Sequence, residues 1–222
     1  MYVARYISRS KIIKYIATGV TLAAIILISV PGMARAEKHL VLALGDSLTA
    51  GYGLPPGEGF PDQLEKKLAE KGMEVKVSNA GVSGDTSSGG LARLSWVLDS
   101  FGAEKPDLVI LEFGANDALR GIDPRITRQN LSRMLEILKS RQIPVLFAGM
   151  LAPPNMGPDY AGDYNRIYPE LAAEYDVAFY PFFLEGVAGK PQLNQEDGMH
   201  PNRQGVAVIV ENILPYVLKN LR

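Results

Sequence analysis

The chain of 222 residues contains no cysteine. This absence excludes disulfide bonds, a thiol nucleophile and a lipid-modified cysteine, so packing alone must hold the folded chain together. The sequence also lacks internal repeats, low-complexity tracts and any linker that would divide residues 37–222. We therefore expect residues 37–222 to form one domain with a sizeable core.

Acidic residues are missing from the first 36 positions, which hold five basic residues and an apolar stretch over 15–30. A basic start, an apolar stretch and the ending Ala34-x-Ala36 are typical of a secretory signal peptide cleaved before Glu37. The alternative is a membrane anchor, but an apolar stretch of 16 residues falls short of the roughly 20 that span a bilayer. We expect an exported protein, periplasmic or secreted, with no stable membrane span after cleavage.

Without this leader the chain has 18 basic and 24 acidic residues, which gives a net charge of −6. That balance argues against nucleic acid, or an anionic membrane surface, as the main partner. No cluster of His, Cys and Asp suggests a metal, and no cofactor is expected. We expect a monomer that acts on a small molecule.

Strand-like and helix-like patterns alternate along the rest of the chain. The strand-like segments are 39–45, 74–80, 107–114, 143–150 and 177–183, and helical spacing occurs around 60–72, 91–101, 124–138, 164–175 and 203–220. Apolar strands joined by helices predict an α/β fold with a five-stranded parallel sheet covered on both faces. In the third helix, opened by Asp123 and Pro124, the residues expected on the inner face are Ile126, Leu131, Met134, Leu135 and Leu138.

Ligands of such sheets bind beyond the carboxyl ends of the strands, so the loops that follow strands carry the functional information. The first contains Ser47, directly after the buried strand, and the last contains Asp197 and His200 in "DGMHPN". Serine needs a base to take its proton, and a carboxylate three residues before the histidine can orient the imidazole. The other histidine, His39, begins the first strand at the opposite end. These residues predict a Ser47–His200–Asp197 triad.

An oxyanion needs hydrogen-bond donors, and three candidates lie in these loops. They are the backbone N–H of Ser47, the backbone N–H of Gly81 and the side-chain amide of Asn116. Gly81 could instead serve only its turn, and Asn116 could bond only its own loop.

Other loop residues are expected to have structural roles. Asp46 should tie its turn together through local backbone bonds and take no part in catalysis, and Asp85 or Thr86 should cap the following helix. Asp117, which follows Asn116, should be structural. Asn79 could position the second loop. The segment 150–163 is expected to be a long irregular loop. Its apolar residues Leu151, Met156 and Tyr160 are expected to line an acyl pocket, although its prolines and glycines are equally typical of a plain surface loop.

At these residues the sequence resembles the SGNH, or GDSL-type, hydrolases. The four family blocks correspond to Ser47 in "GDSLTAGYG", Gly81 in "NAGVSGDTS", Asn116 in "GANDALRG" and His200 in "DGMHPN". They occur in the family's order and cover residues 37–222 from end to end. The stretch 168–202 is similar to the bacterial exported arylesterases and acyl-CoA thioesterase/lysophospholipases.

The resemblance implies a three-layer, flavodoxin-like α/β/α fold and hydrolysis of acyl or aryl esters through an acyl-enzyme. It implies Ser47 as nucleophile, His200 as base and Asp197 as its partner. Ser47 N–H, Gly81 and Asn116 would then form the oxyanion hole. Acyl thioesters and lysophospholipids are further substrates that the resemblance implies.

Three alternatives stay open at this point. The same fold could serve a carbohydrate O-deacetylase, although no appended carbohydrate-binding domain is present. It could also serve a flavodoxin-like binding module, with the loop at Ser47 holding a flavin phosphate. An exported scaffold with a dead site is the third, but it would lack a triad member, and none is missing.

The leader hypothesis predicts the N-terminus of the exported protein. Intact mass or N-terminal sequencing of exported material should find Glu37 first, because the signal peptidase removes residues 1–36. Recovery of Met1 to Ala36 on protein in the membrane fraction would support the anchor instead.

Overall fold

The computed structural model describes residues 38–221, so the predicted leader lies outside the described residues. The sheet has five strands, β1 (His39–Gly45), β2 (Val75–Gly81), β3 (Leu108–Glu112), β4 (Val145–Ala148) and β5 (Ala178–Tyr180). Their order is β2-β1-β3-β4-β5, and every neighbouring pair is parallel. The predicted α/β fold with a five-stranded parallel sheet is confirmed.

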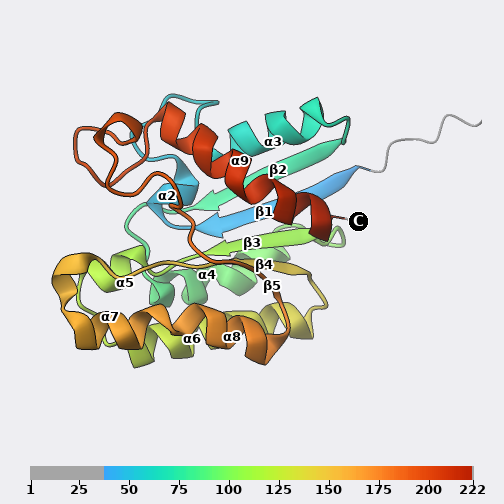
Figure 1. Cartoon of the computed structure of the whole chain (residues 1–222). Helices are drawn as coiled ribbons and strands as arrows, with labels where there is room; N and C mark the ends of the chain where they lie inside the picture. Colours follow the sequence, from blue (N-terminus) through green and yellow to red (C-terminus); the bar gives the residue numbers. More distant parts are fainter. Residues whose placement is uncertain (1–37, 222) are drawn as a thin grey trace, which may run out of the picture. The chain divides into compact units, whose positions relative to one another are not determined.

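Helices cover both faces of the sheet, giving three layers (Figure 1). On one face lie α3 (Phe60–Glu70) and α9 (Arg203–Asn220), and on the other lie α4 (Ser87–Asp99), α6 (Pro124–Ser140) and α8 (Ile167–Tyr175). The short helices α2 (Ser47–Ala50), α5 (Ala115–Leu119) and α7 (Pro158–Asn165) lie at the edge toward which the strand arrows point. This edge therefore gathers the loops that sequence analysis singled out.

The strands are apolar on both faces because both faces are covered. All five residues of β3 are buried, and so are the last five of β1. The register pairs Gly45 with Gly81 across β1 and β2, so both strands end at the same level. Parallel strands that end together bring their following loops side by side.

Side-chain caps begin three of the long helices, as the sequence predicted in part. Thr86, not Asp85, caps α4 by accepting a hydrogen bond from Gly89 N–H. Asp123 caps α6 and is followed by Pro124, and Asn202 caps α9 through two backbone N–H groups. Such caps satisfy amide donors that the first helical turn leaves free, which fixes where each loop ends.

The inner face of α6 differs from the prediction at one position. Leu131, Met134, Leu135 and Leu138 are buried, but Ile126 is 46% exposed. Thr127 takes the inward position, because it lies four residues before Leu131 and hence on the same stripe. The prediction for Ile126 was wrong because the face on which a helical residue lies depends on its spacing from the other buried residues, not on its hydrophobicity.

The segment 150–163 is more regular than predicted. It contains the 3₁₀ turn η1 (Pro154–Met156) and most of α7, which begins at Pro158 after Gly157 with φ of +83°. Proline at the first helical position was the available signal. A second 3₁₀ turn, η2 (Pro191–Leu193), precedes the loop that carries His200.

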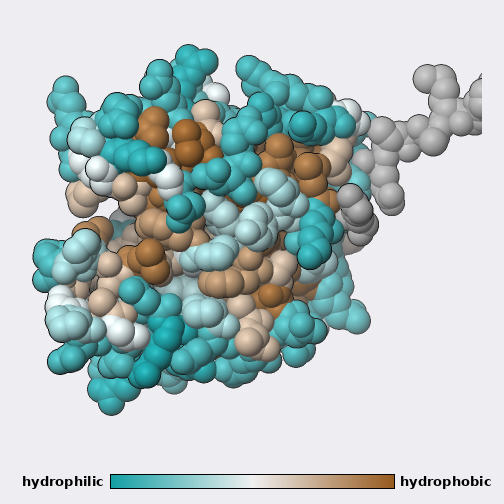
Figure 2. Space-filling model, viewed as in Figure 1, coloured by the Kyte–Doolittle hydropathy of each residue, from teal (hydrophilic) through white to brown (hydrophobic). Residues whose placement is uncertain are grey.

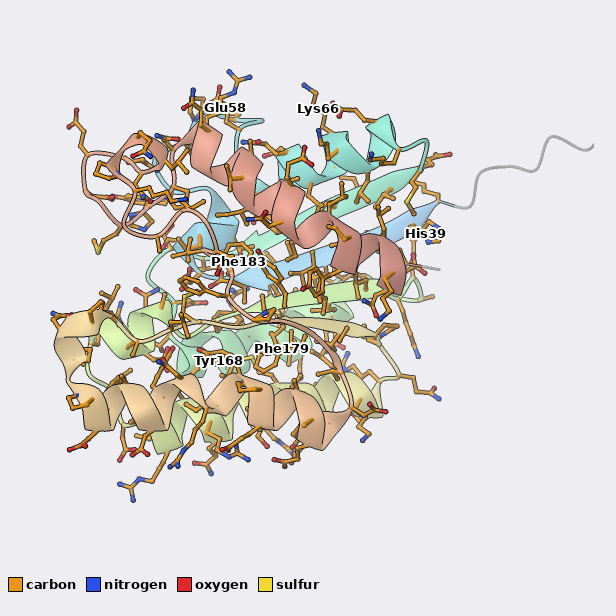
Figure 3. All side chains as sticks on the ribbon, viewed as in Figure 1. His39, Glu58, Lys66, Tyr168, Phe179 and Phe183 are labelled. Atoms are coloured by element: carbon orange, nitrogen blue, oxygen red, sulfur yellow. The ribbon has the colours of Figure 1, made fainter. Side chains whose placement is uncertain are left out.

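Side chains fill the layers on both sides of the sheet (Figure 3). Tyr168 reaches from α8 toward the sheet, and Phe183 packs between the sheet and α9. His39 lies at the opposite end from the loop-rich edge, as predicted, with its ring near Asp107. Within residues 38–221, no helix combines the length and apolar character needed to cross a bilayer.

The corrected face of α6 can be tested by paired truncations. Leu131→Ala should lower the free energy of unfolding by about 2–5 kcal/mol, because it leaves a cavity in the core. Ile126→Ala should change it by no more than about 0.5 kcal/mol, because its side chain already faces water. Urea denaturation of both variants gives the two free energies of unfolding. Equal decreases would mean that Ile126 is a core residue after all.

Candidate active site

Ser47 is the first residue of α2, two positions after β1 ends at Gly45. A side chain at Gly45 has no room, because a Cβ there would lie about 2.1 Å from Thr49 Oγ1 and 2.5 Å from Glu112. Asp46 caps α2 by accepting a hydrogen bond from Leu48 N–H at 2.9 Å. Within residues 38–221, the backbone N–H of Ser47 donates to no acceptor, as expected for the first turn of a helix. The predicted turn-stabilising role of Asp46 is confirmed.

His200 lies between Ser47 and Asp197, as the triad prediction requires. Its Nε2 is 2.9 Å from Ser47 Oγ, and its Nδ1 is 2.6 Å from Asp197 Oδ2. The ring of Tyr52 lies over the imidazole with centroids 4.6 Å apart. The structure therefore brings the three predicted side chains into one hydrogen-bonded chain.

Backbone hydrogen bonds hold the loop that carries His200. The carbonyl of His200 accepts from Gln195 N–H at 2.8 Å, and Asn194 forms an antiparallel bridge with Pro201. The side chain of Gln195 also donates to the carbonyl of Tyr52, in the loop after α2. The loops of the nucleophile and the base are thus fastened to each other directly.

Asp197 is ionised throughout the neutral range. Partial burial raises its pKa, but hydrogen bonds from the backbone and ring of His200 and from Met199 N–H outweigh burial and hold it at about 2. An ionised Asp197 keeps the proton of His200 on Nδ1 and leaves Nε2 free to accept from Ser47.

Asn116 enters the site from the second position of α5. Gly114, with φ of +121°, starts this helix, and the hydroxyls of Tyr164 and Tyr168 fill the place where a side chain at Gly114 would lie. The Nδ2 of Asn116 donates one hydrogen bond to Asp46 Oδ2 at 3.1 Å. An amide nitrogen has two hydrogens, so one remains for another acceptor.

Gly81 does not fit its predicted part as a donor. Its N–H already donates to Asn79 Oδ1 at 2.9 Å. Its lack of a side chain serves packing, because a Cβ there would lie 2.2 Å from the backbone nitrogen of Ala50 in α2. The prediction that Asn79 positions this loop agrees with its two bonds, to Gly81 and to the carbonyl of Ala50.

Gly84, in the same loop, has the properties that Gly81 lacks. Its φ is +84°, and within residues 38–221 its N–H has no acceptor. Its carbonyl accepts a hydrogen bond from Arg120 at 2.8 Å, which ties it to the end of α5. The motif "VSGDTS" contains this glycine, but the sequence does not show which amide of the loop is left without an acceptor.

A buried carboxyl pair behind Ser47 was not predicted. Glu112, the last residue of β3, is fully buried, and so is Asp46. Glu112 Oε2 accepts from Thr49 Oγ1 at 2.8 Å and from Asp46 N–H at 3.3 Å. In the sequence Glu112 stood inside an apolar strand, and only the fold reveals what it faces.

Asp117 has a structural role, as predicted. It is fully buried and accepts hydrogen bonds from the N–H and hydroxyl of Ser87 and from the hydroxyl of Thr127. These bonds join α5 to the starts of α4 and α6. Asp117 therefore secures the helix that presents Asn116 without contacting Ser47.

An apolar cavity of about 520 Å³ opens beside Ser47 and His200. Leu119, Leu151, Phe182, Leu184 and Met199 contribute to its walls. Of the three residues predicted to line an acyl pocket, Leu151 does so, while Met156 and Tyr160 are not among the lining residues. Figure 2 shows a hollow with apolar surface at the edge where α2 and α5 lie. Within residues 38–221, no group of three His, Asp or Glu side chains could hold a metal.

Comparison with known proteins gives matches over most of the chain. A profile of the GDSL-like lipase/acylhydrolase family matches residues 43–208. Esterase TesA of Pseudomonas aeruginosa is 42% identical over 181 residues, which cover 82% of this chain and 89% of that protein. Thioesterase 1/protease 1/lysophospholipase L1 of Escherichia coli is 42% identical over 176 residues, covering 79% and 82%. The crystal structure of AlinE4, an SGNH-hydrolase family esterase, is 49% identical, with a TM-score of 0.70 and coverage of 84% and 98%.

The depressed pKa of Asp197 predicts a pH-dependent contribution to stability. Its native pKa of about 2 lies below the unfolded value of about 3.9, so its stabilisation is complete above pH 4 and is lost as the pH falls toward 2. Asp197→Asn keeps the shape and one acceptor oxygen. The gap in unfolding free energy between wild type and this variant should be present at pH 6 and shrink at pH 3, in denaturant titrations at both pH values. A gap that is unchanged would mean that Asp197 is not specifically stabilised in its ionised form.

Proposed function

Because the chain belongs to the GDSL-like lipase/acylhydrolase family, we propose that it is a serine esterase that acts through an acyl-enzyme on Ser47. The observation that carries this proposal is the chain of hydrogen bonds from Ser47 Oγ through His200 to Asp197. The apolar cavity that Ser47 and His200 help to line supports the proposal, because it offers room for an acyl group beside the nucleophile.

The reaction proceeds in two halves. His200 Nε2 takes the proton of Ser47 as Oγ bonds to the carbonyl carbon, and the carbonyl electron pair moves onto oxygen. The tetrahedral intermediate collapses, the C–O bond to the alcohol breaks, and His200 returns its proton to the leaving oxygen. Water then repeats the sequence on the acyl-enzyme, releasing the acid and restoring Ser47. Asp197 stabilises the imidazolium in both halves.

Negative charge on the carbonyl oxygen needs donors that are already in place. The backbone N–H of Ser47 and the second hydrogen of the Asn116 amide are two such donors. For the third donor we propose the N–H of Gly84 in place of that of Gly81, because the latter is already bonded to Asn79. The hydrogen bond from Arg120 to the carbonyl of Gly84 holds the following peptide unit and so restrains the residue that carries this N–H.

The cavity favours esters with an apolar acyl chain. Its walls are formed mainly by leucine, methionine, proline and phenylalanine side chains. Acyl thioesters and lysophospholipids present the same acyl group with different leaving groups, and relatives bear names for both activities. A carbohydrate O-deacetylase is the weaker candidate, because an acetyl group would leave most of the cavity unfilled. A flavin-binding module would not require the hydrogen bonds that connect Ser47, His200 and Asp197.

Export is part of the same proposal. The basic and apolar character of residues 1–36 supports delivery outside the cytoplasm and cleavage before Glu37. We further propose that the exported enzyme acts as a monomer on a small-molecule ester and uses no cofactor.

Removing the nucleophile or the base should abolish most ester hydrolysis while leaving the fold intact. Ser47→Ala and His200→Ala should each lower kcat for a nitrophenyl ester by at least about 1,000-fold, and the double variant should be little worse, because the triad acts as a unit. Steady-state kinetics gives the rates, and circular dichroism with thermal unfolding verifies the fold.

His39→Ala is the matched control, since it removes the other histidine far from the site. It should retain wild-type kinetics. Activity within a few-fold of wild type in Ser47→Ala or His200→Ala would exclude the proposed mechanism.

A further inference from the structure

A second polar cluster lies behind the nucleophile and is sealed from water. Asp46 and Glu112 are both fully buried, and Thr49 is 1% exposed. The backbone N–H of Asp46 and the hydroxyl of Thr49 both donate to Glu112 Oε2. The mechanism described above uses none of these three side chains directly.

The two oxygens of Asp46 have different partners. Oδ1 accepts from Leu48 N–H at 2.9 Å, which caps α2, and Oδ2 accepts from Asn116 Nδ2 at 3.1 Å. The cap requires only an acceptor, which asparagine would supply equally well. The bond to Asn116 requires a second acceptor, which only a carboxylate has while its other oxygen caps the helix.

The pair holds one negative charge, and it resides on Asp46. Burial first, and then the negative charge of Asp46, raise the pKa of Glu112 well above its usual range, so Glu112 is neutral. Burial also raises the pKa of Asp46, but the bonds from Leu48 and Asn116 counteract this and hold it at about 6. Glu112 Oε1 has no hydrogen-bond partner within residues 38–221, which fits an uncharged carboxyl group.

The other charged groups near Asp46 leave this assignment in place. His200 favours the ionised form of Asp46 and Asp117 opposes it, and both effects are smaller than that of burial. Arg93, from α4, donates to the carbonyl of Gly45 and pairs with Asp85 at 2.7 Å, so its charge is already partnered. Asn116 is the only side chain that donates to Asp46 within residues 38–221.

We propose that Asp46 is a positioning residue for the oxyanion hole, whose ionised carboxylate holds one amide hydrogen of Asn116 and thereby directs the other toward the reacting carbonyl oxygen. The inference rests on the proposed function, because it gives the Asn116 amide its task. The two hydrogens of an amide nitrogen lie in one plane at fixed angles, so anchoring one fixes the other. Without the anchor the amide can rotate about its last side-chain torsion, which has a broad energy profile.

Asp46→Asn tests this directly, because it preserves the size of the side chain and leaves one acceptor oxygen for the helix cap. Its NH2 group then faces the Asn116 amide, and two donors that face each other cannot form a hydrogen bond. We expect kcat to fall about 10- to 100-fold at pH 8, since loss of a whole oxyanion donor costs about 100- to 1,000-fold, while KM changes less than about threefold. A purely structural role would lower the melting temperature and leave kcat within a few-fold of wild type, which would overturn the proposal.

A kinetic double-mutant cycle shows whether Asp46 acts through Asn116. Asn116→Ala should cost more than Asp46→Asn, and adding Asp46→Asn to Asn116→Ala should lower kcat less than about threefold further. Full additivity would mean that Asp46 acts by another route and would overturn the proposal. The proposed function would survive that result, since it depends on the loss of activity in Ser47→Ala and His200→Ala.

The charge gives a second signature that a structural role would not produce. With a pKa of about 6, only about a tenth of Asp46 is ionised at pH 5. The ratio of kcat between wild type and Asp46→Asn should therefore fall several-fold from pH 8 to pH 5. Taking the ratio removes any pH dependence that the two proteins share, and a constant ratio would contradict the charge assignment.

Glu112→Gln serves as an isosteric matched comparison. It replaces a carboxyl group that is already neutral, so it should lower kcat at pH 8 much less than Asp46→Asn does. A loss of kcat equal to that of Asp46→Asn would overturn the proposal.

A measurement on His200→Ala keeps the test available if Asp46→Asn does not fold. This variant has no imidazole next to Ser47, and the side-chain amide signal of Asn116 can be identified in ¹H–¹⁵N spectra by its loss when Asn116→Ala is added. That signal should move as the pH passes through about 6, because its acceptor gains a proton. A signal that stays fixed between pH 4.5 and 8 would contradict the proposal.

Discussion

The close approach of α2 to the ends of three strands is the constraint on which the site depends. Gly45 and Gly81 have no room for a Cβ, because Thr49, Glu112 and the backbone of Ala50 occupy that space. A helix packed this tightly has little freedom to move, so Ser47 is fixed relative to the sheet. Residues on the other loops, such as His200, can therefore contact Ser47 at a constant distance.

Each of those loops is fastened by bonds of its own. The loop of His200 is tied to Tyr52 through Gln195, and α5 is tied to α4 and α6 through Asp117. All of these bonds join parts of the protein to one another and need no contribution from a bound molecule. The site is therefore preorganised, which is the condition under which fixed dipoles stabilise developing charge most effectively.

Much of this arrangement could be predicted from the sequence, because parallel strands oblige their following loops to meet at one edge. That rule brought Ser47, Asn116 and His200 together without knowledge of any contact. It could not choose between Gly81 and Gly84, since the choice depends on which amide Asn79 occupies. Spacing alone would have placed Thr127, not Ile126, on the inner face of α6. The burial of Glu112 next to Asp46 could not be predicted, because the sequence does not show which groups a charged residue at the end of an apolar strand contacts in the folded chain.

Burying the carboxyl groups of Asp46 and Glu112 also lowers the free energy of unfolding of the domain. A charge in the core must be desolvated, and apolar side chains of similar volume often stabilise such positions by comparison. Replacing both carboxyl groups with apolar side chains of similar volume is therefore expected to raise the free energy of unfolding. The role in turnover that we propose for Asp46 is a reason to keep its charge in spite of that cost, and it would make this cluster a point where activity and stability make opposite demands on the chain.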